Sequence, residues 1–276
     1  MEPCSHHGKT PPCADLIIKH KIPEVVVGTL DPHDKVAGKG IKKLQDSGAT
    51  VLVGVLENEC KKHHKRFLTY QQKKRPYILL KWAETNDGFI APDKNIRSKN
   101  PEPFWITNSI SKQKAHQLRS QEQAILVGTN TVLEDNPKLD VRHWKGISPT
   151  RIILDKDLKT PLNYHVLDGS TKTIILTEVK TPKKSLENTV CEVINFSENI
   201  AQQVCNLLYK HNILSVLIEG GTKTLQTFID ANLWDQATVF TGATNFKKGI
   251  KAPEFKGNLV RTETLKKDIL KTYTND

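Results

Sequence analysis

The stretch Val216-Leu217-Ile218-Glu219-Gly220-Gly221 carries the pattern that decides the fold. A short apolar run that ends at a polar turn predicts a buried strand, and the amphipathic pattern over residues 222–231 predicts a helix directly after it. Open α/β sheets bind ligands beyond the carboxyl ends of their strands, where glycine amides and a helix N-terminus favour phosphate. Because a Gly-Gly pair is often only a tight turn, a turn and a ligand cradle both remain open here.

The same alternation of short apolar strands with helices extends outward from this stretch. It predicts parallel βα units, and therefore the α/β fold class. Ser109 is the expected N-cap of one helix. The predicted strands are 25–28, 49–56, 77–82, 124–128, 151–154, 173–176 and 237–240, and the other predicted helices are 14–20, 40–46, 57–70, 109–119 and 200–210.

A lysine-rich segment that is poor in apolar residues, 71–76, is typical of a linker. It predicts two domains, residues 1–74 and residues 75–276. The first of these is smaller than most βα domains that stand alone. We therefore expect it to be the carboxyl-terminal half of such a domain.

The composition indicates a globular protein. Of the 276 residues, 37% are hydrophobic and 26% are charged. No apolar run approaches the roughly 20 residues that span a bilayer, and the first residues do not resemble a signal peptide. The five cysteines are an odd number spread along the chain, which argues against a disulfide framework. These features predict a cytoplasmic protein.

The net charge of +11 favours an anionic partner. The lysines and arginines are scattered in pairs, and aromatic residues make up only 6% of the chain. A surface that binds single-stranded nucleic acid combines a basic groove with many aromatic side chains. We therefore expect phosphorylated small molecules, or a cofactor with a 2′-phosphate, rather than nucleic acid.

Two thiols near the start of the chain, Cys4 and Cys13, are flanked by prolines and are typical of a zinc-binding loop. A catalytic zinc needs three protein ligands and an open fourth position. Zinc-dependent base deaminases use one histidine, two cysteines and a glutamate two residues after the histidine. No His-x-Glu occurs in this sequence. His6 or His7 remains open as a third ligand, or as a loop or substrate-contacting residue.

Several polar side chains follow the predicted strand 124–128. Thr131 and Asp135 would share one face of a helix, and Arg142 would suit two-point binding of phosphate. The sequence Asp135-Asn136-Pro137 is also an ordinary turn signal. Trp105 would suit stacking on a planar ligand, with packing in the core as the alternative.

In combination these motifs resemble the bifunctional riboflavin-biosynthesis deaminase/reductase family over nearly all of the chain. The resemblance implies a partial cytidine-deaminase-like α/β module followed by a dihydrofolate-reductase-like α/β domain. The motifs that carry it are, in chain order, Glu2-Pro3-Cys4-Ser5-His6-His7-Gly8-Lys9-Thr10-Pro11-Pro12-Cys13, Asp31-Pro32, Val36-Ala37-Gly38-x-Gly40, Leu80-Lys81-x-Ala83-x-x-x-Asp87-Gly88, Trp105-Ile106-Thr107, Gly128-x-x-Thr131-Val132-x-x-Asp135-Asn136-Pro137-x-Leu139-x-Val141-Arg142, residues 151–155 and Glu219-Gly220-Gly221.

For the second module the resemblance implies an NADPH-dependent reductase that opens a phosphoribosyl ring to a ribityl chain. It implies that Lys81, Asp135 and Glu219 polarise or protonate the reacting centre. The cofactor is then expected along Trp105, Thr131, Asp135, Gly221 and Thr222. The substrate is expected at Arg119, Leu139, Arg142 and Glu219, with the two arginines suited to its 5′-phosphate.

For the first module the resemblance implies a zinc-dependent pyrimidine deaminase. Cys4 and Cys13 match its zinc thiolates, and His6 and Lys9 match substrate-contacting positions. The zinc site is incomplete in this chain, because the histidine ligand and the catalytic glutamate have no counterpart. The sequence also departs from the family at two positions, where a usual asparagine is His33 and a usual serine is Pro103.

The sequence therefore predicts a cytoplasmic enzyme of riboflavin biosynthesis with a complete reductase and an N-terminally truncated deaminase. Its expected partners are a phosphorylated pyrimidine substrate and further copies of the chain, with neither nucleic acid nor membrane. Three alternatives remain. The chain is fully bifunctional if its start is misassigned. Its front portion is a non-catalytic zinc or dimerisation module. Or the chain is a fragment of a nucleic-acid base deaminase with an accessory domain.

Overall fold

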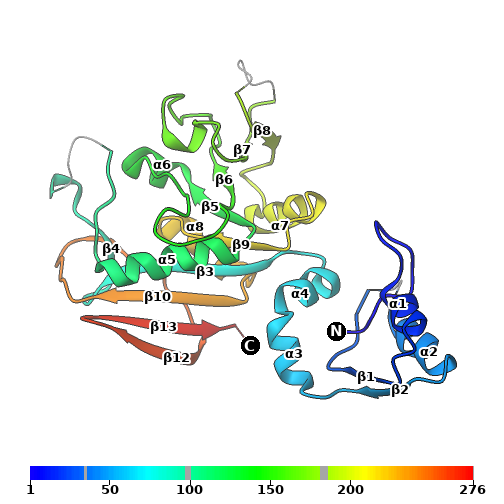
Figure 1. Cartoon of the computed structure of the whole chain (residues 1–276). Coiled ribbons are helices and arrows are strands. Elements are labelled where there is room, and N and C mark those ends of the chain that lie inside the picture. Colours follow the sequence, from blue (N-terminus) through cyan, green and yellow to red (C-terminus); the bar gives the residue numbers. More distant parts are fainter. Residues whose placement is uncertain (34–35, 97–100, 181–185, 276) are drawn as a thin grey trace. The chain divides into compact units, whose positions relative to one another are not determined.

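The computed structural model of the protein describes residues 1–33, 36–96, 101–180 and 186–275 (Figure 1). The chain divides into two compact units, Met1–Arg75 and Pro76–Asp276. Among the described residues, no helix is both long and apolar enough to cross a membrane. The helix before the boundary, α4, runs to Lys73, and Lys74 ends it in a left-handed conformation with φ of 53°. The predicted linker over 71–76 is therefore wrong at its start.

The described residues of unit 1 form a two-stranded parallel sheet and four helices. Strands β1 (Glu24–Val27) and β2 (Thr50–Val53) pair in register from Glu24–Thr50 to Val27–Val53. The β-branched side chains of both strands favour this extended conformation. The helices are α1 (Cys13–Lys19), α2 (Lys39–Asp46), α3 (Glu57–His63) and α4 (Lys65–Lys73). The single helix predicted over 57–70 is thus two helices that meet at His64.

The carboxylate of Glu2 holds the N-terminal segment against the start of α2. It accepts N–H groups from Gly38 at 3.0 Å, from Gly40 at 2.9 Å and from Ile41 at 3.4 Å. A side chain at position 40 has no space, because a Cβ there would lie 1.9 Å from the carbonyl oxygen of Pro3. These contacts explain why the Glu2-Pro3 motif and the Gly38-x-Gly40 motif occur in the same sequence.

Unit 2 is built on a nine-stranded sheet in the order β12-β13-β10-β3-β9-β5-β6-β7-β8. The seven strands from β10 to β8 pair in parallel, and β13 and β12 continue one edge antiparallel. The strands are β3 (Tyr77–Thr85), β5 (Ala124–Gly128), β6 (Thr150–Leu154), β7 (Thr173–Thr177), β8 (Thr189–Val193), β9 (Ser215–Ile218), β10 (Gln236–Gly242), β12 (Asn258–Leu265) and β13 (Asp268–Thr274), with a separate antiparallel pair β4 (Phe89–Pro92) and β11 (Gly249–Lys251). The predicted α/β class is confirmed.

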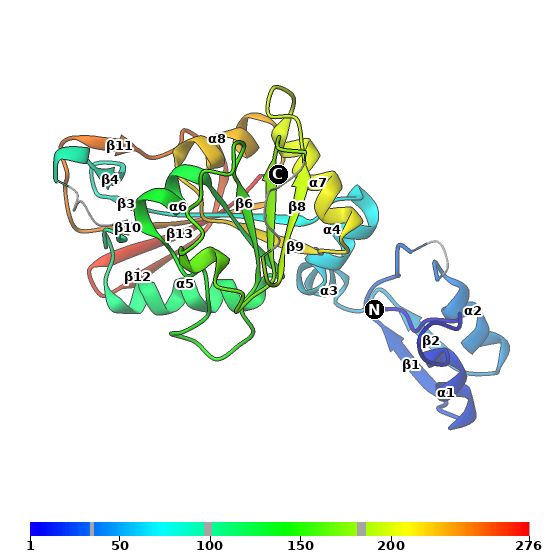
Figure 2. The same ribbon diagram turned by 90° about the horizontal axis from the view of Figure 1, so that it is seen from above.

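Helices cover both faces of this sheet (Figure 2). One core includes Ile78 and Leu80 of β3 with the apolar faces of α7 (Ile200–Lys210) and α8 (Thr222–Asp230). The other face buries Leu79 with Val132 of α6 (Thr129–Asp135), and α5 (Ser109–Gln121) lies on that side. Because successive side chains of a strand point to opposite faces, both cores are built from the same apolar runs.

Two details of unit 2 differ from the sequence prediction. The N-cap of α5 is Asn108 rather than Ser109, since the Asn108 side chain accepts the N–H groups of Ile110 and Ser111. Strands β4, β8, β11, β12 and β13 were not predicted. Strand β12 is an exposed edge strand with polar residues such as Arg261 and Glu263, so it lacks the apolar run of a buried strand.

Candidate active site

A cavity of about 430 Å³ lies in unit 2, next to strands β3, β5 and β9. It is where the parallel strands β5 and β9 end, at Gly128 and Ile218. Ligands of open α/β sheets bind at this edge. The predicted site residues among its lining are Lys81, Trp105, Arg119, Thr131, Asp135, Leu139, Arg142 and Glu219.

Glu219 is the centre of a buried charge cluster in this cavity. It follows β9, and its own N–H is bonded to the carbonyl of Leu126 at 3.0 Å. Its carboxylate accepts two hydrogen bonds from Arg119, from Nε at 2.9 Å and from Nη2 at 2.8 Å. The Nζ of Lys81, on the neighbouring strand β3, lies 3.6 Å from the same carboxylate. The side chains of Lys81, Arg119 and Glu219 are only 15%, 13% and 8% exposed.

The charges in this cluster give Glu219 and Lys81 different chemical roles. Burial alone would raise the pKa of Glu219, but Arg119 and Lys81 hold that pKa at about 2. Burial lowers the pKa of Lys81, and the attraction of Glu219 opposes this only in part. At neutral pH Glu219 is therefore an ionised acceptor, and Lys81 is the member of the pair that can give up a proton.

Three of the five N–H donors of Arg119 are bonded to protein groups. Beyond the two bonds to Glu219, its Nη1 donates to the carbonyl of Asp140 at 3.2 Å. Arg119 thus lies in the cavity where the substrate is expected. Its bonds hold the carboxylate of Glu219 in position. Arg142, in contrast, has a side chain that is 35% exposed, and its Nη1 pairs with the carboxylate of Asp140. Of the two arginines, Arg142 is the more accessible to a ligand.

The segment after β5 is both a turn and part of the site. Thr131 and Asp135 line the cavity from α6, as their helical spacing predicts. Asn136 ends α6 at φ of 40°, and its side chain accepts the N–H of His165 at 2.9 Å. Leu139 is buried at φ of 53°, a left-handed conformation that is rare for leucine. The turn therefore carries Leu139 and Arg142 into the cavity wall.

Trp105 lies at the cavity with its side chain half open to solvent. The residue is 52% exposed, so the alternative of core packing is wrong. The Nζ of Lys112 lies 3.3 Å from the centre of its ring. The preceding Phe104 packs edge-on against Phe246, with 5.2 Å between the ring centres. The indole is thus held in place and has a face accessible for a planar ligand once Lys112 moves.

The Gly220-Gly221-Thr222 turn has partners within the protein. The N–H of Gly221 donates to Thr131 Oγ1 at 3.0 Å, and the Thr222 hydroxyl donates to the carbonyl of Lys251. A Cβ at Gly220 would lie 2.7 Å from Cβ of Thr224, so packing alone requires this glycine. Gly221 and Thr222 are not among the residues that line the cavity. Their role in cofactor binding stays a prediction.

Two titratable cavity residues on α5, Lys112 and His116, were missed by the sequence prediction. His116 is buried, and its Nδ1 accepts the N–H of Arg142 at 3.3 Å, so its Nε2 carries the proton. Burial, together with Arg119 and Arg142, lowers the pKa of His116 to about 4. Lys112 lies one turn before His116 on the same helix face. Counting back from Arg119 in helical steps would have found both.

In unit 1 the structure brings the two predicted zinc thiols together but shows no complete metal site. The N–H of Cys13 donates to Sγ of Cys4 at 3.3 Å. Within residues 1–33, 36–96, 101–180 and 186–275, no group of three or more histidine, cysteine or acidic side chains is placed to hold a metal ion. His6 lies near His33, with ring centres 6.2 Å apart, and Lys9 is exposed. The zinc prediction is therefore without support in the described residues.

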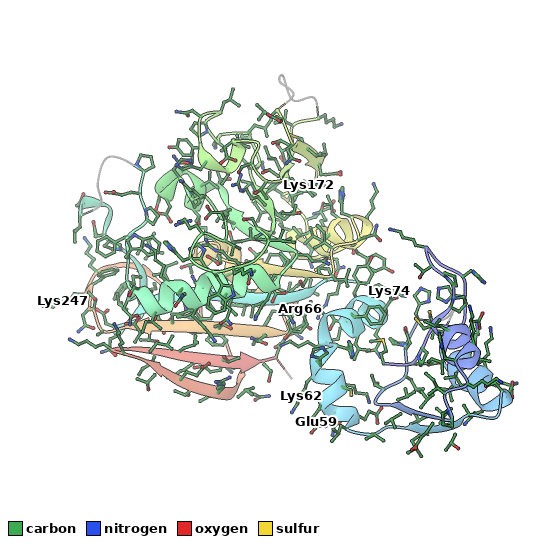
Figure 3. All side chains as sticks on the ribbon, in the orientation of Figure 1. Glu59, Lys62, Arg66, Lys74, Lys172 and Lys247 are labelled. Atoms are coloured by element: carbon green, nitrogen blue, oxygen red, sulfur yellow. The ribbon has the colours of Figure 1, made fainter. Side chains whose placement is uncertain are left out.

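Basic side chains are also present outside the lining of the cavity. Lys172 and Lys247, labelled in Figure 3, are exposed and extend from widely separated parts of unit 2. The exposed Lys62 and Lys74 belong to unit 1. This distribution agrees with the scattered lysine pairs of the sequence.

Comparison with known proteins gives consistent likenesses. Residues 76–269 match the family described as the RibD C-terminal domain. The riboflavin biosynthesis protein RibD of Aquifex aeolicus is 39% identical over 243 residues, which cover 87% of this chain and 67% of that protein. Of the next curated relatives, also RibD proteins, the chain covers 60% to 64%.

Two solved structures are similar over 99% of this chain. One is a diaminohydroxyphosphoribosylaminopyrimidine deaminase/5-amino-6-(5-phosphoribosylamino)uracil reductase from Thermotoga maritima, with 36% identity, a TM-score of 0.86 and 77% of that chain covered. The other is RibD of Acinetobacter baumannii, with 28% identity, a TM-score of 0.87 and 78% of that chain covered.

Proposed function

Because the chain belongs to the RibD family of riboflavin biosynthesis proteins, we propose that unit 2 is an NADPH-dependent reductase of 5-amino-6-(5-phosphoribosylamino)uracil. The observation that carries this proposal is the buried cluster of Lys81, Arg119 and Glu219 at the edge of the sheet where the strands end. Such a cluster places a proton donor and an ionised acceptor side by side, both largely buried in the cavity wall. A reduction at a sugar carbon needs both.

The residues at the cavity fit a nicotinamide cofactor. The half-exposed ring of Trp105 offers a stacking surface for a planar group. Thr131 and Asp135 line the cavity from one face of α6 and would hold the polar edge of the nicotinamide. The resemblance to the family implies that Gly221 and Thr222 also lie along the cofactor. When bound, NADPH supplies the hydride that is added to C1′ of the sugar.

The chain's own residues would act on the sugar and its phosphate. Lys81 would donate a proton to the ring oxygen as its bond to C1′ breaks, so that the ribosyl group becomes a ribityl chain. Glu219 would accept hydrogen bonds from sugar hydroxyls, because it stays ionised at neutral pH. Arg142 would bind the 5′-phosphate, and the buried Leu139 would form the wall beside the sugar. Asp135 is a further candidate for polarising the reacting centre.

An oxidation assay tests the proposal. The full chain is mixed with NADPH and the deaminated ribosylaminopyrimidine, and loss of NADPH absorbance is followed. We expect turnover with this substrate and none with dihydrofolate, whose pterin ring lacks the phosphoribosyl group that Glu219 and Arg142 would hold. K81M, a change within the buried cluster, should retain the fold and lose most of the turnover. Absence of turnover at millimolar substrate by a folded protein would refute the reductase.

In unit 1, two of the residues that the resemblance assigns to a zinc site are present. Cys4 and Cys13 are two thiols, whereas a catalytic zinc needs three ligands. We therefore derive no zinc-dependent step, and substrate contacts of His6 and Lys9 stay predictions. Measurement of zinc bound per chain tests the zinc module, which would bind about one ion; a zinc content near zero would reject it and leave the metal-free dimerisation module. The cytoplasmic location and a homo-oligomeric state also stay predictions.

A further inference from the structure

Helix α5 presents three nitrogen-bearing side chains to the cavity, at positions 112, 116 and 119. Two of them have defined roles in the structure as it stands. Arg119 is bonded to Glu219 and to the carbonyl of Asp140. His116 is neutral at physiological pH, because its pKa lies at about 4. The remaining one, Lys112, has no such anionic or carbonyl partner in the part of the chain that the structure describes.

Among the described residues, no carboxylate lies within ion-pair distance of Lys112. Its Nζ instead lies over the ring of Trp105, 3.3 Å from the ring centre. Burial lowers the pKa of Lys112, and the positive charge of Arg142 lowers it further, so the two cations are close enough to repel each other. Asp140 pairs with Arg142, whereas no carboxylate of the described residues pairs with Lys112, so the two cations leave uncompensated positive charge at the cavity that an anion can neutralise.

The chemistry of a phosphomonoester matches this arrangement. At neutral pH such a group carries a charge of about −1.5 to −2. The planar guanidinium of Arg142 can bind two phosphate oxygens at once, while the ammonium of Lys112 is a point charge on a flexible stem. Arg119, in contrast, already has its charge balanced by the carboxylate of Glu219, so it offers less net positive charge to a phosphate than Lys112 does.

We propose that Lys112 and Arg142 together bind the 5′-phosphate of the substrate, and that Lys112 leaves the ring of Trp105 when the phosphate arrives. This inference rests on the reductase function proposed above. It adds Lys112 to the residues that select a phosphorylated substrate. It also couples the two ligands, since departure of Lys112 exposes the indole face on which a planar ring can stack. A substrate without the phosphate leaves Lys112 over the indole.

The experiment compares wild type, K112M and the matched control K114M. Lys114 lies two residues further along α5 and is not among the cavity residues, so K114M removes the same charge without touching the site. For each protein, kcat/KM is measured with the 5′-phosphorylated substrate and with its dephosphorylated riboside. We expect wild type and K114M to prefer the phosphorylated substrate by about 100-fold or more. K112M should reduce that preference by about tenfold, because a hydrogen bond between charged groups is lost.

A second arm separates the substrate's phosphate from the 2′-phosphate of the cofactor. The ratio of kcat/KM for NADPH over NADH should be the same in wild type and K112M. If K112M keeps the preference for the phosphorylated substrate within about twofold, or loses the NADPH preference instead, the proposal is overturned.

A third arm does not depend on turnover. Binding of ribose 5-phosphate and of ribose is measured by calorimetry on the full-length proteins. We expect wild type and K114M to bind ribose 5-phosphate about tenfold or more tightly than ribose, and K112M to lose most of this difference. Equal binding of the two sugars by wild type overturns the phosphate site even where the reductase assay succeeds. Absence of turnover with intact discrimination by calorimetry refutes the reductase and leaves the phosphate site standing.

Discussion

Arg119 and Glu219 are 100 positions apart in the chain and form a two-point hydrogen bond, with Nε–Oε1 at 2.9 Å and Nη2–Oε2 at 2.8 Å. The pair joins α5 to the end of β9 and lies in the wall of the cavity. Parallel, charge-assisted bonds of this kind fix orientation as well as distance. Glu219 is consequently held ionised and in one position, with Lys81 beside it.

Replacement of Arg119 by lysine should impair the site without removing its charge. R119K keeps a cation near Glu219 but loses one of the two parallel bonds and the bond to Asp140. We expect kcat/KM to fall by about 10- to 100-fold with both the phosphorylated substrate and its riboside. R119M should also lower stability by roughly 3–5 kcal/mol, because a buried carboxylate loses its partner. A loss confined to the phosphorylated substrate would instead assign Arg119 to the phosphate.

Replacement of Lys81 tests the assignment of the proton donor. K81M removes the only lysine of the Glu219 cluster while the Arg119–Glu219 pair remains. We expect kcat to fall by about 10²- to 10⁴-fold, the usual cost of losing a general acid, with little change in the affinity for NADPH. Single-turnover kinetics and NADPH fluorescence titration measure the two quantities separately. Unchanged kcat in K81M would transfer the role to another group, and Asp135 would be the next to test.

Much of unit 2 was predictable from the sequence because its central strands are fully buried. Runs such as Val216–Ile218 and residues 124–128 are apolar and β-branched, which fixes them as strands without tertiary information. Strand β12 was missed because it is exposed and carries Arg261 and Glu263. Its pairing with β13 depends on contacts that a local pattern does not contain.

The candidate site was predictable only where a residue matched a motif. Asp135, Arg142 and Glu219 were named from the sequence, and all three line one cavity. Lys112 and His116 were missed because α5 has a polar sequence that resembles a solvated helix face. The hydrogen-bonded ion pair between Arg119 and Glu219 was also missed, because two residues this far apart in the sequence come together only in the folded chain.

The low pKa of His116 predicts a pH-dependent stability. The group titrates at about 4 in the folded protein and near 6.5 in the unfolded chain. Between these values the unfolded chain binds the proton and the folded protein does not. The free energy of unfolding is therefore undiminished above pH 6.5 and decreases as the pH falls to 4. The loss is of the order of 3 kcal/mol, since one pKa unit corresponds to about 1.4 kcal/mol.

Urea unfolding at pH 7 and pH 4.5 measures this dependence. H116N replaces the imidazole by an amide that still accepts the N–H of Arg142 and has no titration in this range. We expect the difference in unfolding free energy between the two pH values to be smaller in H116N by about 2 kcal/mol. The exposed His143, whose ring packs edge-on against His116, offers the control variant H143N, which should retain the wild-type difference. Equal pH dependence of H116N and wild type would contradict the assignment.

Replacement of Glu2 should loosen unit 1 without changing the chemistry of unit 2. The carboxylate is 5% exposed and accepts three N–H groups at the start of α2, where an anion also interacts favourably with the helix dipole. E2Q keeps the size of the side chain but removes the charge, so we expect a loss of about 1–3 kcal/mol and faster proteolysis within residues 1–75. The exposed Glu59 on α3, labelled in Figure 3, supplies the control variant E59Q, which should change stability by less than about 0.5 kcal/mol. NADPH turnover by the full chain should remain within about twofold in both variants. Equal protease sensitivity of E2Q and E59Q would show that the Glu2 contacts do not hold the unit together.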